Sequence, residues 1–299
     1  MKESYRRRVV KAGRTLDISC TYPTRFGDKL TRSRRRNPTS ESMRVYNEEL
    51  AVRRLTLILN ENFKPDDWWV TLHYERHNRP ASYDAAQEVI VSFIPKLRRL
   101  YRAEGEELRA VKCTAFGERG AVHHHLVINR GVSPRKITAL WKEHIHASID
   151  ARPPCYVALY ESGEYSGVAG YILQQKQTVT GERPRGVRKW SGTQNLRKPQ
   201  AISDRRIEKF SWQEPPTAPA GYFVDTDSIR AGCNPVNGRP YLFYRCIRID
   251  ESFSCYGEDG KRLSGKEAVK YYRQRNREQL KKSWIDLNPE GEVVFRQNE

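Results

Sequence analysis

The sequence lacks the features of several large protein classes. No stretch approaches the roughly 20 consecutive apolar residues that a membrane span requires, and none resembles the apolar core of a signal peptide. Its six cysteines are scattered over 299 residues without a C-x-x-C pair. These absences argue against membrane spans, disulfide scaffolds and zinc knuckles. They favour a chain that works in a reducing cytoplasm, with no membrane partner.

Acidic residues are too few to balance the basic ones. The chain has 54 Lys+Arg against 36 Asp+Glu, which gives a net charge of +18. This surplus points to a polyanionic partner, most plausibly nucleic acid, with a merely soluble basic protein as the alternative. The hydrophobic content of 37% is low, but 16 Tyr, 9 Phe and 6 Trp argue against a wholly disordered chain. We expect a folded protein with a full core.

The positive charge is concentrated in two segments. The first 36 residues hold 12 Lys+Arg and 3 Asp+Glu without apolar periodicity, which predicts a flexible basic arm over residues 1–41. This arm would neutralise DNA phosphates, and a solvated tail is the alternative. A second basic segment covers residues 178–210. Its candidate DNA-binding residues are Arg183, Arg185, Arg188, Lys189, Arg197 and Lys198.

Apolar periodicity and turn residues between these segments predict an α+β domain over residues 42–210. The expected helices are 43–62, 82–103 (N-capped by Ser82), 133–149 and 166–177, and the expected strands are 68–74, 108–117, 122–129 and 155–161. The first strand and the elements after it follow the order β-α-β-β-α-β-α, which contains the split β-α-β of a ferredoxin-like fold. We expect an antiparallel sheet with helices on one face and the other face free for a substrate. Residues 211–299 are predicted to form a small C-terminal α+β extension, whose role the sequence does not indicate.

Three consecutive histidines, His123-His124-His125, lie in the predicted strand 122–129. Residues i and i+2 of a strand share a face, about 7 Å apart, so the imidazoles of His123 and His125 can converge on one divalent cation. A two-residue turn at Arg119-Gly120 would place Glu118 on the same face as a third ligand. Two imidazoles and a carboxylate suit Mn²⁺ or Mg²⁺. Three ordinary histidines on a hairpin are the alternative.

Tyr171 is a candidate nucleophile on the predicted helix 166–177. A phenol close to a metal-bound phosphate can attack phosphorus and become a covalent phosphotyrosine. A packing or surface role is the alternative. Tyr165, six residues earlier at the start of the helix, is a weaker catalytic candidate. His73, at the end of the first strand, can also approach this face of the sheet.

Together these motifs resemble those of the HUH endonucleases, and more narrowly of rolling-circle replication initiators of small plasmids, phages and integrated mobile elements. The resemblance covers about residues 45–200. It rests on Asn62-Phe63-Lys64-Pro65 before the first strand, Gly117-Glu118 followed by the histidine triplet, Val168-Ala169-Gly170-Tyr171-Ile172, and Lys189-Trp190-Ser191-Gly192-Thr193-Gln194-Asn195-Leu196.

The resemblance implies a metal-dependent endonuclease and strand transferase that nicks single-stranded origin DNA. His123, His125 and Glu118 would hold Mn²⁺ or Mg²⁺. Tyr171 would form a 5′-phosphotyrosine and free a 3′-OH, and the strand would later be rejoined. Its partners would be a single-stranded origin hairpin and the helicase and polymerase of a bacterial host, in whose cytoplasm it would act. A relaxase or transposase of the same superfamily and a non-catalytic DNA-binding regulator are the alternatives.

Two positions differ from simple motif patterns. The family often places a lysine three residues after the tyrosine, where this chain has Gln174, so Lys176 is the candidate replacement. Gly260–Lys266 matches the start of a phosphate-binding loop, but Glu267 follows where Ser or Thr would bind Mg²⁺. The same segment fits a helix capping box from Ser264 to Glu267, so no helicase domain is expected.

Overall fold

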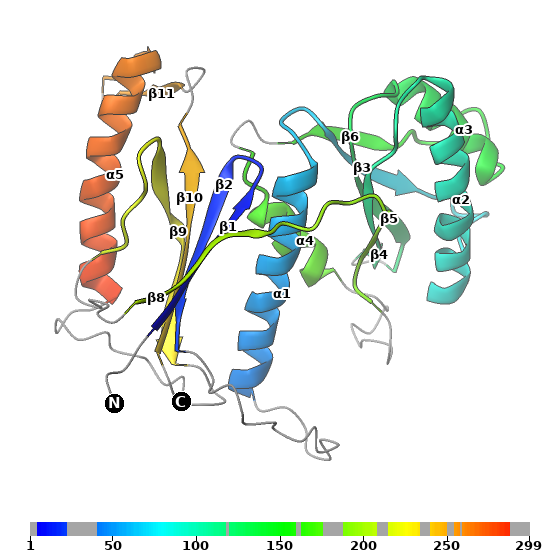
Figure 1. Cartoon of the computed structure of the whole chain (residues 1–299). Helices are drawn as coiled ribbons and strands as arrows, with labels where there is room; N and C mark the ends of the chain where they lie inside the picture. Colours follow the sequence, from blue (N-terminus) through cyan, green and yellow to red (C-terminus); the bar gives the residue numbers. More distant parts are fainter. Residues whose placement is uncertain are drawn as a thin grey trace. The chain divides into compact units, whose positions relative to one another are not determined.

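The computed structural model describes residues 5–22, 41–117, 120–159, 163–175, 188–207, 215–233, 240–249, 254–257 and 259–287. The chain divides into two compact units (Figure 1). Unit 1 consists of Met1–Leu50 and Pro199–Glu299, and unit 2 consists of Ala51–Lys198. The expected domain limits at residues 42 and 210 therefore differ from the limits of the compact units.

None of the helices in the described ranges combines the length and the apolar character that a membrane crossing demands.

Unit 2 contains the predicted ferredoxin-like arrangement. Its strands are β3 (Trp68–His73), β4 (Ala110–Phe116), β5 (Val122–Ile128), β6 (Cys155–Ala158) and the short β7 (Ser191–Gly192). They form an antiparallel sheet in the order β6-β3-β5-β4-β7. Without β7, this is the order 4-1-3-2 of a split β-α-β, so the predicted fold class is confirmed.

One face of this sheet is covered by α2 (Tyr83–Ala103) and α3 (Pro134–His144). Ser82 caps α2 by accepting a hydrogen bond from the Ala85 amide, as predicted, and Ser133 with Pro134 begins α3. The buried positions of α2 recur at helical spacing, so one stripe of the helix packs on the sheet. They are Tyr83, Ala86, Ile90, Phe93, Ile94, Leu97 and Tyr101.

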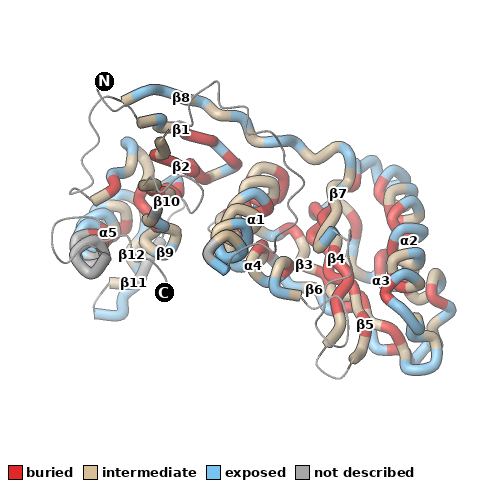
Figure 2. The backbone as a smooth tube through the Cα atoms, turned by 90° about the horizontal axis from the view of Figure 1, so that it is seen from below, coloured by how far each residue is buried: buried red, intermediate tan, exposed pale blue. Residues whose placement is uncertain are grey.

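The prediction that helices cover only one face is wrong. The second half of α1 (Glu41–Asn62) and α4 (Ser166–Gln174) pack against the other face. Leu55 and Leu59 of α1 join Val111 and Val127 of the sheet in one buried cluster. The physical reason is the sheet itself: the central strands carry apolar residues on both faces, and both must leave water (Figure 2).

The β4–β5 hairpin also differs from its predicted register by one residue. Ala115 lies opposite His123 and Cys113 opposite His125, where a two-residue turn would place residues 116 and 114. The Gly120 amide donates to the Gly117 carbonyl, and Gly120 has a positive φ of 71°. These are marks of a three-residue turn that ends in a left-handed glycine. The register argument that placed Glu118 beside His123 therefore no longer applies.

Unit 1 is built from both ends of the chain. It contains β1 (Tyr5–Ala12), β2 (Thr15–Thr21), β8 (Ala201–Ile207), β9 (Tyr222–Cys233) and β10 (Pro240–Arg248), in the order β8-β1-β2-β10-β9. The first half of the expected flexible arm is thus a hairpin within a sheet, and residues 23–40 lie outside the described ranges. The expected C-terminal extension is not a separate body, because β10 pairs directly with β2.

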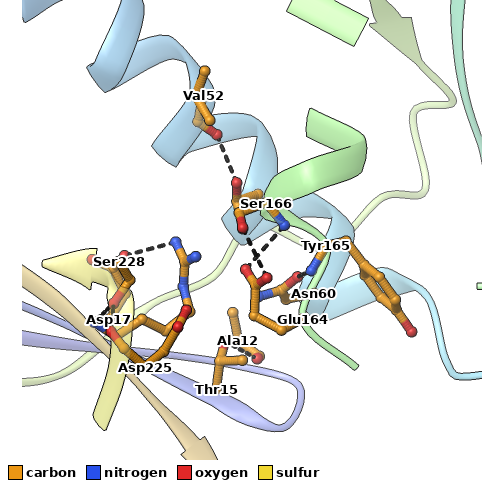
Figure 3. Close-up of polar contacts among 12 residues, drawn as sticks. Ala12, Thr15, Asp17, Val52, Asn60, Glu164, Tyr165, Ser166, Asp225 and Ser228 are labelled. Carbon is orange, nitrogen blue, oxygen red and sulfur yellow. Dashed lines mark hydrogen bonds and ion pairs between the residues drawn. The ribbon is translucent and has the colours of Figure 1, made fainter. Parts of the chain in front are cut away.

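A buried ion pair lies within this second sheet. Arg245 of β10 lies opposite Asp17 on β2 and Asp225 on β9, and its guanidinium is 3.3 Å from the Asp17 carboxylate. The side chains of Arg245 and Asp17 are only 6% and 4% exposed. Figure 3 shows Asp17, Asp225 and Ser228 grouped on these strands; the Ser228 hydroxyl accepts from the Arg245 amide.

The C-terminal part of unit 1 has no phosphate-binding loop at Gly260–Lys266 within its described residues. β11 (Ser254–Tyr256) and β12 (Arg262–Ser264) form a hairpin, and α5 (Gly265–Leu287) begins directly after β12. A strand that runs straight into a helix leaves no loop between them to surround phosphates. This agrees with the expectation of no helicase domain.

Candidate active site

His123 and His125 point to a common place on the sheet face that carries α4. Their Nε2 atoms are 3.0 Å apart. Two imidazole ligands at the usual metal–nitrogen distance of about 2.1 Å, set at right angles, would hold their nitrogens about 3 Å apart. The spacing in the structure therefore fits two neighbouring ligands of one octahedral cation.

The opposite ring nitrogens fix the direction in which these imidazoles present their lone pairs. Nδ1 of His123 is 3.1 Å from the Ala121 carbonyl, which can only accept, so Nδ1 carries the proton and Nε2 is left unprotonated. Nδ1 of His125 is 3.1 Å from the Thr71 hydroxyl, which can accept in the same way. Outer hydrogen bonds of this kind orient metal-binding histidines.

Electrostatics keep these rings neutral. Burial, followed by the charges of His123 and His73, lowers the pKa of His125 to about 3. Burial also lowers the pKa of His123, against the opposing effect of its hydrogen bond to Ala121. A neutral imidazole is the form that binds a cation.

The described residues do not complete a metal site. Within the described ranges, no group of three His, Cys, Asp or Glu side chains is placed to hold an ion. Glu118, the predicted third ligand, lies outside those ranges. The donor set of two convergent neutral imidazoles nevertheless fits a divalent cation, and Glu118 stays a prediction.

Tyr171 of α4 lies against the same histidine pair. Its ring centroid is 5.3 Å from that of His125 and 5.6 Å from that of Trp69, edge-on in both cases. Trp69 in turn stacks on His125 at 4.7 Å. Tyr171 is 48% exposed, so its side chain is accessible to a substrate from solvent. The structure thus brings together the two histidines and the tyrosine that the sequence singled out.

Tyr165 differs from its expected catalytic role. Its side chain is fully buried and belongs to the cluster formed by α1, α4 and the sheet. Its backbone amide donates to the side chain of Asn60, and its ring points away from Glu164 and Ser166 (Figure 3). A residue without exposed surface cannot meet a DNA phosphate, so Tyr165 is a core residue at the start of α4.

Both ends of α4 are held by side chains. At the start, the Glu164 carboxylate accepts hydrogen bonds from the amide and the hydroxyl of Ser166 (Figure 3). At the end, the Lys189 ammonium donates to the Leu173 carbonyl. Lys189, expected to bind DNA, therefore also fastens the helix that carries Tyr171. Lys176, the other catalytic candidate, lies outside the described residues.

The remaining predicted DNA-binding residues are only partly described. Arg188, Arg197 and Lys198 have exposed side chains, whereas Arg183 and Arg185 lie outside the described ranges. The segment carrying Arg197 is anchored by reciprocal hydrogen bonds between its backbone and the side chain of Asn62. This anchoring holds two exposed cations at a defined place on unit 2.

The middle histidine of the triplet points to the opposite face. His124 is fully buried; its Nε2 is 2.6 Å from the Tyr74 hydroxyl and its Nδ1 is 2.8 Å from the Thr114 hydroxyl. Thr114 also accepts from Gln87 of α2. Because both nitrogens have partners within the core, His124 is part of the scaffold beneath the site.

A cavity of about 230 Å³ opens next to the site, at the end of β3 and the start of β5. His73 and His123 line one part of it, and Arg79 and Arg152 line another. His73 lies directly opposite His123 across the two strands, with ring centroids 6.3 Å apart. The two arginines were missed by sequence reasoning, because they lie in loops that only the fold brings to the histidines.

Comparison with known proteins places this unit in a family. Residues 67–176 match a family model described as replication-associated protein ORF2. The matched segment, a little over a third of the chain, belongs to this replication-associated family and contains both convergent histidines and Tyr171. No significant match was found among curated proteins or among solved structures.

Proposed function

We propose that the protein initiates rolling-circle replication by nicking single-stranded origin DNA with Tyr171. The observation that carries the proposal is the convergence of two neutral imidazoles with an accessible tyrosine on one sheet face. The match to a replication-associated family supports the biological setting. Metal binding, the tyrosine nucleophile and the origin substrate are all parts of this proposal.

In the proposed reaction the Tyr171 oxygen forms a bond to phosphorus while the bond from phosphorus to the 3′ oxygen breaks. The phenol gives up its proton, and the departing 3′ oxygen takes one up as a 3′-OH. A divalent cation held by His123, His125 and Glu118 would polarise the phosphate and neutralise its developing charge. Attack on the phosphotyrosine by a later 3′-OH rejoins the strand and frees the phenol.

The surrounding residues support a nucleic-acid substrate. Trp69 packs against both His125 and Tyr171, so it restricts the directions from which the tyrosine can be reached. Arg79 and Arg152 border the cavity beside His123 and have exposed side chains. Neither forms an ion pair with another described residue, which leaves both guanidiniums available to phosphates that flank the scissile one.

The test is a denaturing gel of single-stranded origin DNA incubated with the full chain and Mn²⁺. A 3′-labelled strand should move with the protein as a covalent adduct, and a 5′-labelled strand should give a short free product. Tyr171→Phe should remove the adduct and keep DNA binding, and EDTA should remove it from the unaltered chain. Tyr165→Phe is the matched control and should keep the adduct.

The results separate the alternatives. A shifted native band without cleavage by the unaltered chain would favour the non-catalytic regulator. An adduct that persists in Tyr171→Phe would place the nucleophile on another tyrosine. Cleavage of a transfer-origin or transposon-end strand in preference to a replication origin would favour a relaxase or a transposase.

A further inference from the structure

Two basic segments that lie far apart in the sequence are neighbouring strands in unit 1. β1 begins near the N-terminus and β8 follows residue 200, yet they pair antiparallel along most of their length (Figure 1). In this register Arg6 lies opposite Arg206, and Arg7 lies opposite Arg205. We call this pair of strands the β1–β8 ribbon.

The ribbon concentrates positive charge. Its two strands carry six cations and a single carboxylate, Asp204, for a net charge of +5. No residue of β8 is buried, and β8 is the edge strand of its sheet (Figure 2). Asp204 is shared: it forms a two-pronged bond to Arg6 at 2.6 and 2.7 Å and lies directly opposite Arg8.

The register is electrostatically unfavourable for the protein alone. Like charges directly opposite one another on neighbouring strands destabilise a sheet. Two consecutive arginine–arginine pairs, one on each face, place this cost on both sides of the ribbon. Charged edge strands also protect a sheet from aggregation, but alternating acids and bases would do this without the repulsion. Repeated like pairing is typical of a surface that meets a polyanion.

We propose that the β1–β8 ribbon binds the phosphate backbone of duplex DNA. Arginines hold phosphates through paired donors and supply affinity without reading sequence. Sites for single strands combine basic grooves with aromatic side chains on which bases stack. The one aromatic residue in β1 and β8 is Tyr5, whose ring packs edge-on against Tyr22 at 4.9 Å. A basic ribbon without a stacking surface therefore favours a duplex over a single strand.

The experiment measures binding of a labelled duplex of arbitrary sequence to the full chain in EDTA, as a function of salt. EDTA prevents metal-dependent cleavage, so the result does not depend on the nicking proposal. The test variant is Arg205→Gln/Arg206→Gln. The matched control is Arg273→Gln/Arg277→Gln, which removes the same charge from exposed positions of α5 in the same unit.

We expect the test variant to reduce the slope of log affinity against log salt by about 2, with the control unchanged. Asp204→Asn should bind duplex more tightly, since it releases Arg6. The test variant should also melt at or above the temperature of the unaltered chain, because repulsion is relieved. An equal loss in test and control variants, or a loss confined to single-stranded DNA, would overturn the proposal.

Discussion

His124 shows how the scaffold under the candidate site depends on one polar side chain. It connects Tyr74 and Thr114 inside the core, and Thr114 connects onward to Gln87 of α2. This chain of hydrogen bonds ties the strand that carries His123 and His125 to the helix layer. A site that must hold two nitrogens 3.0 Å apart depends on a rigid strand of this kind.

Replacing His124 by Ala should therefore reduce stability. The substitution leaves the buried Tyr74 and Thr114 hydroxyls without a partner and opens a cavity, so we expect the free energy of unfolding to fall by about 2–5 kcal/mol. Urea denaturation followed by circular dichroism measures the change. His77→Ala, at an exposed position, is the control and should change little. A His124→Ala variant as stable as the control would contradict the assigned scaffold role.

Arg245 plays the corresponding part in unit 1. Arg245→Leu would leave Asp17 buried without its cation, and loss of one partner of a buried pair costs about 3–5 kcal/mol. We expect unit 1 to unfold at a clearly lower urea concentration. Lys261→Ala removes a cation from an exposed pair with Asp259 in the same unit and should leave the transition unchanged. Equal effects of the two substitutions would show that the buried pair contributes no more than an exposed one.

At this scale the sequence predicted some site residues and misplaced others. The i, i+2 spacing of His123 and His125 survives any register, because both follow from strand alternation alone. The place of Glu118 does not, because it depends on turn length, and Gly120 allows a three-residue turn. Tyr165 and Tyr171 look alike in sequence, and only packing distinguishes the buried one from the exposed one.

Among the elements, α4 is the one on which the proposed chemistry depends. It has nine residues, too few for a helix to be stable without tertiary contacts, and it begins without a side-chain cap from its own N-cap residue. Glu164 at its start and Lys189 at its end compensate. The position of Tyr171 is therefore sensitive to both.

Replacing Lys189 by Met keeps the apolar stem and removes the donor to the Leu173 carbonyl. We expect the last turn of α4 to open more often, so that its amides exchange faster in hydrogen–deuterium exchange measured without DNA. Arg197→Met, which removes a nearby exposed cation, should leave that exchange unchanged. If Lys189 served only to bind DNA, both variants of the free protein would exchange at the same rate.

Elements with strong local signals were predicted well, and those without them were missed. The apolar stripe of α2 and its cap at Ser82 define that helix from sequence. β1 and β8 were missed as strands because their arginines hide any alternation, and only pairing with each other and with β2 makes them strands. β7, two residues long, exists through its contact with β4.

At the scale of the molecule, the two units differ in how their chain segments are joined. Unit 2 is continuous and contains two hydrophobic clusters on the faces of one sheet. Unit 1 needs strands from before and after it. This discontinuity explains why the sequence suggested an arm and an extension: neither end contains a complete core of its own.

We expect residues 41–198 to fold alone, because they carry the whole of both clusters in unit 2. The expected result is a cooperative thermal transition and a dispersed amide NMR spectrum. Deleting residues 1–22 from the full chain should instead disrupt unit 1 and cause aggregation, since it removes β1 and β2 and uncovers β10 as an edge. A deletion variant that stays monomeric with an intact second transition would contradict this division.

The sheet of unit 1 has a consequence for synthesis on the ribosome. β1 and β2 emerge first, but their partners β8 and β10 are translated only after all of unit 2. Since domains fold as they emerge, the nicking unit can mature while the first hairpin still has both flanks unpaired. The nascent hairpin must therefore wait, and its triple arginine keeps that waiting ribbon from joining another chain.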